Sequence, residues 1–193
     1  VFKDFNVNFK LPSMADIKYQ LKEGWYIFIS QVAISGYTSS RLFAVGLFTD
    51  NTITGYYAIA EKLMNVVQTF PLASLVQSLY PRLSNIYPES KERARSLMNR
   101  FQNFTTIIYL IGLPIIYFLA PLIIKLIAGE PYPEVILAFR LLLFAIFFIN
   151  ANAFRVHFLL VSGKDSLYSR IHVIMGIGGF ILTFLMTYFF SFI

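Results

Sequence analysis

Five stretches of apolar side chains, each close to 20 residues long, constrain this sequence more than any other feature. They cover residues 24–48, 63–81, 101–124, 135–161 and 171–193. A helix of about 20 residues crosses the roughly 30 Å of hydrocarbon in a bilayer. Charged residues make up only 13% of the chain, about half the share usual in soluble proteins. The sequence therefore predicts an all-α membrane protein, a bundle of about five transmembrane helices.

The expected organisation is a cytoplasmic lead-in over residues 1–23 and a membrane domain over 24–193, with helices at about 24–48, 53–80, 102–128, 134–161 and 171–193. Ser13 and Asp16 have the spacing of a capping box and predict that a helix begins there. Before it, Phe2, Phe5 and Phe9 repeat at helical spacing, which fits an amphipathic segment on the membrane surface or a flexible linker. Residues 85–101 predict a solvated helix that leads into the third span. Because the sequence begins without Met and ends inside an apolar run, we expect a fragment of a longer protein.

The positions of the basic residues predict how the chain crosses the membrane. Eleven lie before the first span, between Arg82 and Arg100, and in the last loop, whereas the turns near Asp50 and Pro131 have none. Because cytoplasmic loops carry an excess of Lys and Arg, the amino terminus is expected in the cytoplasm and both turns outside. This distribution accounts for most of the net charge of +6, so nucleic-acid binding is not expected. The chain has no cysteine and two histidines, and we expect neither a metal site nor a cofactor.

Five basic residues lie outside those loops: Arg41, Lys62, Lys125, Arg140 and Arg155. A charge at the centre of a membrane helix costs roughly 2.5 to 3.5 kcal/mol, so these side chains should face protein or water. With a rise of 1.5 Å per residue, Arg41, Lys62 and Arg140 lie about 9 to 15 Å from the outer helix ends. Lys125 is near its helix end and can reach water.

Polar residues form one stripe on each of the first two spans. Gln31, Ser35 and Thr38 share one helix face, as do Glu61, Asn65 and Gln68. Hydrogen bonding between helices is one explanation, and a cavity for an anionic, polyhydroxylated ligand is the other. Tyr26, Tyr37, Tyr56 and Tyr57 would add faces for sugar stacking. The candidate substrate-cavity residues are Arg41, Lys62, Arg140, Arg155, Gln31 and Asn65.

Glu61 is the carboxylate that we place within the membrane. It could pair with Arg41 across adjacent antiparallel helices as a fixed brace. It could also exchange an ion as the cavity opens and closes, because burial favours its neutral form and nearby cations its charged form. Both roles stay open from the sequence.

Three motifs carry a family resemblance: GW at residues 24–25, GYYAIAEK at 55–62 and YPRLS at 80–84. From about Tyr19 onward the sequence resembles the polysaccharide (O-antigen) flippases of the Wzx type, in the multidrug/oligosaccharidyl-lipid/polysaccharide exporter superfamily. The family often has Pro after GW, where this chain has Tyr26.

The resemblance implies a multi-pass transporter of the bacterial inner membrane with two helix bundles, of which this chain is the opening part of the second. The missing first bundle would be its partner. The implied activity is transfer of undecaprenyl-diphosphate-linked oligosaccharide between leaflets for surface polysaccharide, O-antigen or lipopolysaccharide synthesis, by alternating access and with H⁺ or Na⁺ as the ion of any antiport. The implied protein is not an enzyme.

Other readings remain. A drug or sodium antiporter of the same superfamily would need acidic residues in its cavity, and Glu61 alone fits that requirement. A membrane-embedded glycosyltransferase would need an Asp-x-Asp pair or a catalytic base on a sizeable loop, and the loops lack the pair. A non-transporting scaffold is a third alternative.

Overall fold

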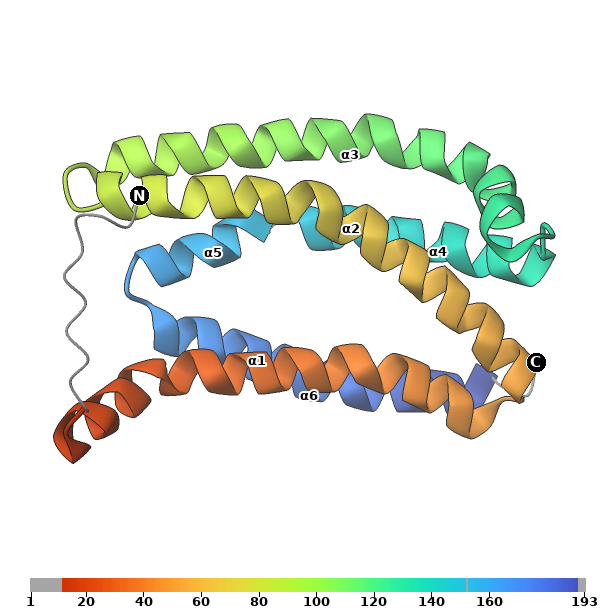
Figure 1. Cartoon of the computed structure of the whole chain (residues 1–193), viewed down its shortest axis with the longest axis horizontal. Helices are drawn as coiled ribbons and strands as arrows, with labels where there is room; N and C mark the ends of the chain where they lie inside the picture. Colours follow the sequence, from red (N-terminus) through yellow and green to blue (C-terminus); the bar gives the residue numbers. More distant parts are fainter. Residues whose placement is uncertain (1–11, 152, 191–193) are drawn as a thin grey trace.

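Six helices form nearly all of the chain in a computed structural model that describes residues 12–151 and 153–190 (Figure 1). Over these residues every regular element is helical, as predicted. The bounds are α1 Met14–Phe48, α2 Asn51–Ile86, α3 Lys91–Ala128, α4 Pro133–Asn150, α5 Ala153–Val161 and α6 Asp165–Phe190. The amphipathic segment predicted around Phe5 lies outside the described residues.

Side-chain caps fix where the first three helices begin. Ser13 caps α1 in the predicted capping box: its hydroxyl accepts from the Asp16 N–H, and the Asp16 carboxylate accepts from the Ser13 N–H at 3.0 Å. The Ser13 hydroxyl also donates to the Asp16 carboxylate, and this bond, together with that from the Ser13 N–H, holds the pKa of Asp16 below its ordinary value. Asp50 caps α2 and Ser90 caps α3 by accepting from the N–H groups of Ile53 and Arg93. The predicted solvated helix before the third span is therefore the first part of α3.

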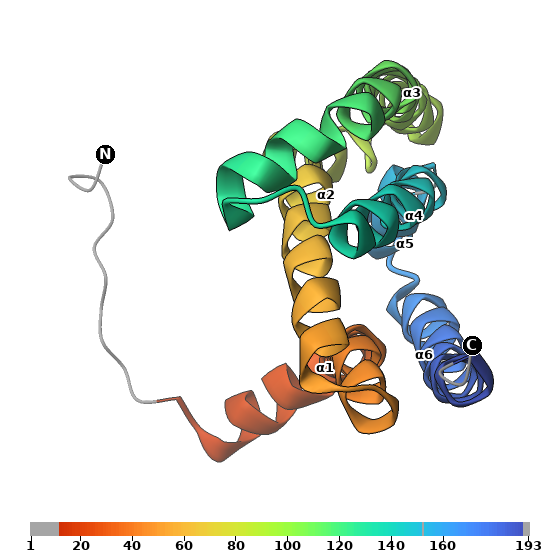
Figure 2. The ribbon, with the colours of Figure 1, turned by 90° about the vertical axis from the view of Figure 1, so that its right-hand side faces the viewer.

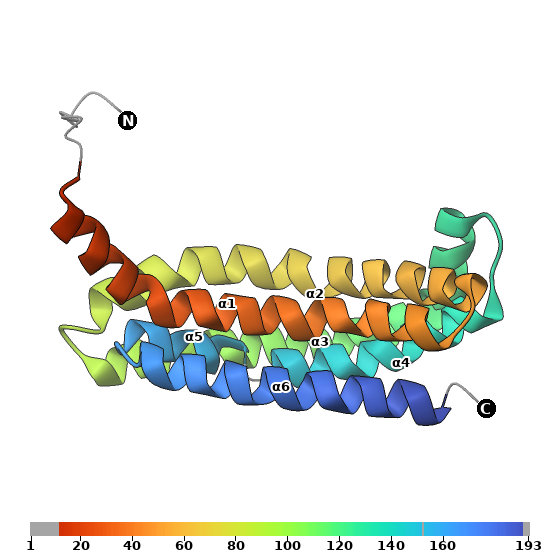
Figure 3. The same ribbon diagram turned by 90° about the horizontal axis from the view of Figure 1, so that it is seen from below.

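The long helices run back and forth between two ends of the molecule. The start of α1 and the α2–α3 and α5–α6 loops lie at one end, and the α1–α2 turn and α3–α4 loop at the other (Figures 1 and 3). Of the basic residues that the sequence assigned to this side, those in the described part of the chain lie in the helix ends and loops at the first end: Lys18, Lys22, Arg82, Lys91, Arg93, Arg95, Arg100, Lys164 and Arg170. This alternation agrees with the charge pattern, and which end faces the cytoplasm stays a prediction.

The helices pack as a pair and a larger group. α1 and α6 run parallel, with Gly176 against Ala33 and the Phe184 ring near Phe43 and Phe48. α2, α3 and α4 enclose an apolar core around Met64, Phe139 and Ile146. A second core around Leu83, Met98 and Phe154 joins α2, α3 and α5. Seen from the end, α2 extends from the larger group toward the pair (Figure 2).

Three segments are long and apolar enough to cross a membrane: Lys91–Ala128, Pro133–Val161 and Asp165–Phe189. α1 and α2 are as long, at 35 and 36 residues. They fall outside this group because each carries a polar stripe within its predicted span, including Arg41 on α1 and Glu61 on α2. The two helices predicted to border a polar cavity are thus the two least suited to lipid on all sides.

The segment expected as one helix over 134–161 is divided. α4 ends at Asn150 and α5 begins at Ala153. The Asn150 side chain donates to the Ile146 carbonyl at 2.9 Å, a local bond typical of Asn at helix ends. A residue far away in the sequence also contributes to the division, as described below.

The Gly176 contact gives a test of the α1–α6 packing. A Cβ at residue 176 would lie 3.3 Å from the Ala33 Cβ and from its carbonyl oxygen, whereas one at Gly178 would meet nothing within 4 Å. We expect Gly176→Leu to destabilise the protein by about 1–3 kcal/mol, the usual cost of overpacking. Thermal unfolding in detergent would measure this, with Gly178→Leu as the matched control. Equal loss in both variants would contradict the close packing.

Candidate functional site

An ion pair between Arg41 and Glu61 joins α1 to α2 within the predicted spans. Arg41 Nη2 lies 3.5 Å from Glu61 Oε1, and the two side chains are 24% and 13% exposed. The pairing considered from the sequence is therefore confirmed. Removing one member of this largely enclosed pair would leave the other charge uncompensated, so the pair is expected to persist while both charges are present.

A cavity of about 380 Å³ lies one helical turn from this pair, toward the α1–α2 turn. Val45 follows Arg41 by four residues and Tyr57 precedes Glu61 by four, which places each on the same helix face as a member of the pair. Tyr57 is also close enough to interact electrostatically with both charges. The cavity surface is mostly apolar, and its lining includes two threonines and a second carboxylate, that of Glu134; the cavity is bordered by Val45, Thr49, Ile53, Tyr56, Tyr57, Glu134, Ala138 and Thr187.

Sequence reasoning found part of this cavity. Tyr56 and Tyr57 were among the predicted sugar-stacking residues, and both border it. Thr49, Glu134 and Thr187 were missed, because they lie at helix ends on three different helices and belong to no polar stripe. Their common location depends on how α1, α4 and α6 pack. The cavity walls can therefore offer hydroxyls, aromatic faces and carboxylate to a ligand.

Four other predicted cavity residues are exposed on their helices: Gln31 on α1, Lys62 and Asn65 on α2, and Arg155 on α5. Lys62 is adjacent in sequence to Glu61, which is only partly exposed, so the two side chains leave α2 in different directions. Whether these four contact a substrate stays a prediction. Within the described part of the chain, no group of three or more His, Asp or Glu is placed to hold a metal ion.

Arg140 contacts α3 at a proline. Its Nε donates to the Tyr117 carbonyl at 3.1 Å, and its guanidinium carbon lies 4.6 Å from the centre of the Tyr117 ring. In a regular helix that carbonyl would accept from residue 121, but Pro121 has no N–H. Arg140 therefore supplies the missing donor. The partner of this charge in the structure is a backbone carbonyl on α3, and whether Arg140 contacts a substrate stays a prediction.

Tyr109 has a similar role at the proline of α2. Pro71 cannot donate to the Val67 carbonyl. The Tyr109 hydroxyl lies 3.5 Å from that carbonyl oxygen and 3.0 Å from that of Gln68. Tyr109 is otherwise buried in the core between α2, α3 and α4. Its hydroxyl thus donates to the α2 backbone beside Pro71, and the closer acceptor is the Gln68 carbonyl.

Gln102 of α3 occupies the division between α4 and α5. Its Nε2 donates to the Asn150 carbonyl at 2.9 Å, and its Oε1 accepts from the Phe154 N–H at 3.2 Å. A continuous α-helix would join these same two backbone groups to each other. The amide, only 2% exposed, is inserted into the helix ladder, a known cause of helix breaks.

Replacing Gln102 by Leu tests this arrangement. The change keeps an apolar volume but leaves the Asn150 carbonyl and the Phe154 N–H without their partner, which costs about 1–3 kcal/mol for each group. We expect lower thermal stability in detergent, with the exposed neighbour variant Asn103→Leu close to wild type. Unchanged stability would mean that the two backbone groups bond each other and that α4 and α5 join.

Two comparisons with known proteins match this chain. Residues 1–87 match the family described as polysaccharide biosynthesis protein. Over 176 residues the chain is 22% identical to the "Putative O-antigen transporter" of Escherichia coli (strain K12), an alignment that covers 91% of this chain and 42% of that protein. The chain thus spans about two fifths of the length of this curated relative. No solved structure matches.

These matches confirm the resemblance that the motifs indicated. The motifs at residues 24–25, 55–62 and 80–84 all fall within the matched segment 1–87. The chain is similar to a family of polysaccharide biosynthesis proteins and to a transporter, and its apolar helices fit a multi-pass membrane protein.

Proposed function

We propose that the protein containing this chain is a flippase, which moves undecaprenyl-diphosphate-linked oligosaccharide across the bacterial inner membrane for surface polysaccharide or O-antigen synthesis. The observation that carries this proposal is the Arg41–Glu61 pair beside a cavity whose lining includes two tyrosines and Glu134, among otherwise apolar helices. Intramembrane charges of this kind mark substrate or ion pathways. The similarity to an O-antigen transporter supports the same class of cargo.

The chemistry of the candidate residues suits an anionic carrier with a sugar head. Arg41, Lys62, Arg140 and Arg155 provide cations for phosphate, and Arg in particular binds phosphate through two parallel hydrogen bonds. Gln31 and Asn65 provide amides for sugar hydroxyls. No step of this transfer breaks a covalent bond, so the proposed protein is not an enzyme.

Alternating access would move the α1–α6 pair against the group of α2, α3 and α4. Arg41 and Glu61 belong to different sides of that boundary, and the cavity lies between the two sides. In this proposal the loops rich in Lys and Arg face the cytoplasm, the cavity lies toward the external end, and the missing helix bundle completes the path.

A cation antiporter of the same superfamily is the second candidate. The sequence argument against it was that only one carboxylate lay inside the membrane. Glu134 also borders the cavity, so two carboxylates are available for H⁺ or Na⁺. Glu61 and Glu134 would be equally placed to carry the coupling ion in a flippase.

Removal of the gene tests the main proposal. Without the protein, lipid-linked oligosaccharide should accumulate in the cytoplasmic leaflet and surface polysaccharide should disappear. A deletion strain that carries the gene with Arg41→Ala should export about tenfold less polysaccharide than one that carries the wild-type gene, at equal protein level. This is the loss expected for one charge-assisted contact. Lys125→Ala, exposed near the end of α3, is the control and should export normally. Normal surface polysaccharide in the deletion strain would refute the proposal.

A charge exchange separates the two roles of Glu61. We propose that Glu61 carries the coupling ion, so the double variant Glu61→Arg with Arg41→Glu should regain wild-type protein levels but remain inactive in export. A brace needs only opposite charges, and an exchanged pair that recovers most export would assign Glu61 that role. Wild-type export by Glu61→Gln, with the same dependence on the proton gradient, would also exclude coupling.

A further inference from the structure

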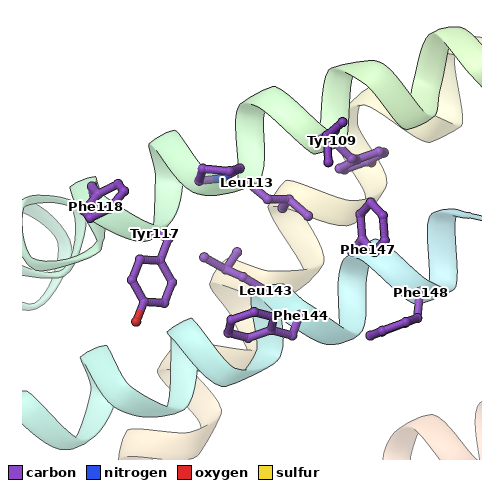
Figure 4. Close-up of a pocket in the computed structure, with 10 residues that line it drawn as sticks. Tyr109, Leu113, Tyr117, Phe118, Leu143, Phe144, Phe147 and Phe148 are labelled. Atoms are coloured by element: carbon purple, nitrogen blue, oxygen red, sulfur yellow. The ribbon is translucent and has the colours of Figure 1, made fainter.

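An apolar groove separate from the cavity beside the ion pair opens between α3 and α4. It has a volume of about 360 Å³, which falls within the usual range for ligand pockets. Six of its ten lining residues are aromatic: Tyr109, Tyr117, Phe118, Phe144, Phe147 and Phe148. Figure 4 shows these rings on the two facing helices. Both helices belong to segments that are long and apolar enough to cross a membrane.

Arg140 lies at one end of this groove. It precedes Phe144 by four residues on α4 and therefore shares its helix face. Its guanidinium is stacked over Tyr117, another lining residue, and only its Nε is used by the Tyr117 carbonyl. Among the residues that the structure describes, no carboxylate forms an ion pair with Arg140. Its two Nη groups are therefore not paired with a carboxylate of these residues and can donate hydrogen bonds to an anion.

We propose that the groove holds the hydrocarbon chain of a polyprenyl phosphate carrier, with the phosphate on Arg140. This inference rests on the proposed function and names the site of the carrier's lipid part. The phosphate would lie about 10 Å from the start of α4, on the predicted external side. The chain would extend from there toward the middle of the membrane, from the level of Tyr117 to that of Tyr109.

A separate site for the chain follows from the energetics of transfer. The sugar head must cross through a polar path, but each methylene moved from lipid into water costs about 0.8 kcal/mol. The hydrocarbon chain of the carrier therefore has to stay in the membrane interior while the sugar head moves. The protein can bind this hydrocarbon chain only at a groove that opens to lipid. The α3–α4 groove has that position and has a cation at the end where the phosphate must lie. A membrane phospholipid would also fit an apolar surface. In the test below, binding of a phospholipid at the groove would contradict the proposal.

The test uses the intact protein in phosphatidylcholine vesicles with a polyprenyl phosphate that carries a photoreactive diazirine in its chain. Crosslinked peptides are located by mass spectrometry. We expect labelling at the α3 and α4 segments that line the groove. Excess unlabelled polyprenyl phosphate should abolish it, and the same excess of phosphatidylglycerol should leave it unchanged.

Two adjacent residues of α3 give a matched pair of variants. Leu110 and Ile111 are each 60% exposed, but only Leu110 is among the groove residues. Leu110→Trp should fill the groove and reduce labelling about tenfold, as expected when an apolar pocket loses its ligand contacts. Ile111→Trp should label like wild type. Equal labelling of the two variants would overturn the groove as the binding site.

The role of Arg140 is tested with polyprenol, the neutral alcohol of the same chain. Wild-type protein should prefer the phosphate by about tenfold, the value of one charge-assisted contact. Arg140→Gln should abolish this preference, and Arg140→Lys should keep part of it. Equal labelling by alcohol and phosphate in wild type, or a preference unchanged in Arg140→Gln, would overturn the assignment of the phosphate. Effective competition by phosphatidylglycerol would overturn the polyprenyl assignment.

Failure of this inference is distinguishable from failure of the proposed function. Loss of surface polysaccharide in the deletion strain together with no labelling of the groove would refute the groove alone. Phosphate-dependent labelling in a protein whose deletion leaves polysaccharide export intact would refute the proposed flippase while the lipid site stands.

Discussion

Water is absent from the hydrocarbon of a membrane, so every backbone group released from a helix ladder needs a partner from the protein. This chain releases such groups at prolines and at the division between α4 and α5. The Arg140 guanidinium supplies the partner at Pro121 and the Gln102 amide those at the division, and the Tyr109 hydroxyl donates to the Gln68 carbonyl beside Pro71. Each comes from another helix, so each repair is also a contact between helices. The irregular backbone and the packing of α2, α3, α4 and α5 are therefore consequences of one constraint.

These repairs also shape the surfaces on which function is proposed. The bond from Arg140 to the Tyr117 carbonyl fixes a cation beside the apolar groove between α3 and α4. A guanidinium can do this because it has five donors: one serves the carbonyl and others remain for a ligand. A lysine at the same position would have to share one ammonium between both tasks. The same residue can thus stabilise the kinked part of α3 and bind phosphate.

The sequence predicted the features that depend on local patterns. Apolar windows indicated the helices, the Ser13–Asp16 spacing predicted the start of α1, and opposite charges at similar depth predicted the Arg41–Glu61 pair. The division of residues 134–161 was not predictable in this way, because Gln102 is 48 residues away from Asn150. The partner of Arg140 was missed for the same reason. Depth along a helix excludes lipid as a neighbour, but it does not distinguish a ligand from a backbone carbonyl left free by a proline on another helix.

The boundary between the α1–α6 pair and the rest of the bundle has a different character from the interior of either part. Within the pair, Gly176 allows close backbone contact, and within the larger group buried side chains such as Phe139 and Met64 form a continuous core. Across the boundary lie a partly exposed ion pair and a cavity. Close-packed cores resist small displacements, because their dispersion contacts are lost over fractions of an ångström. Polar contacts beside a cavity can be exchanged for contacts with water or a ligand. Relative motion of rigid parts should therefore occur at this boundary, which is where a transporter that alternates between two open states needs it.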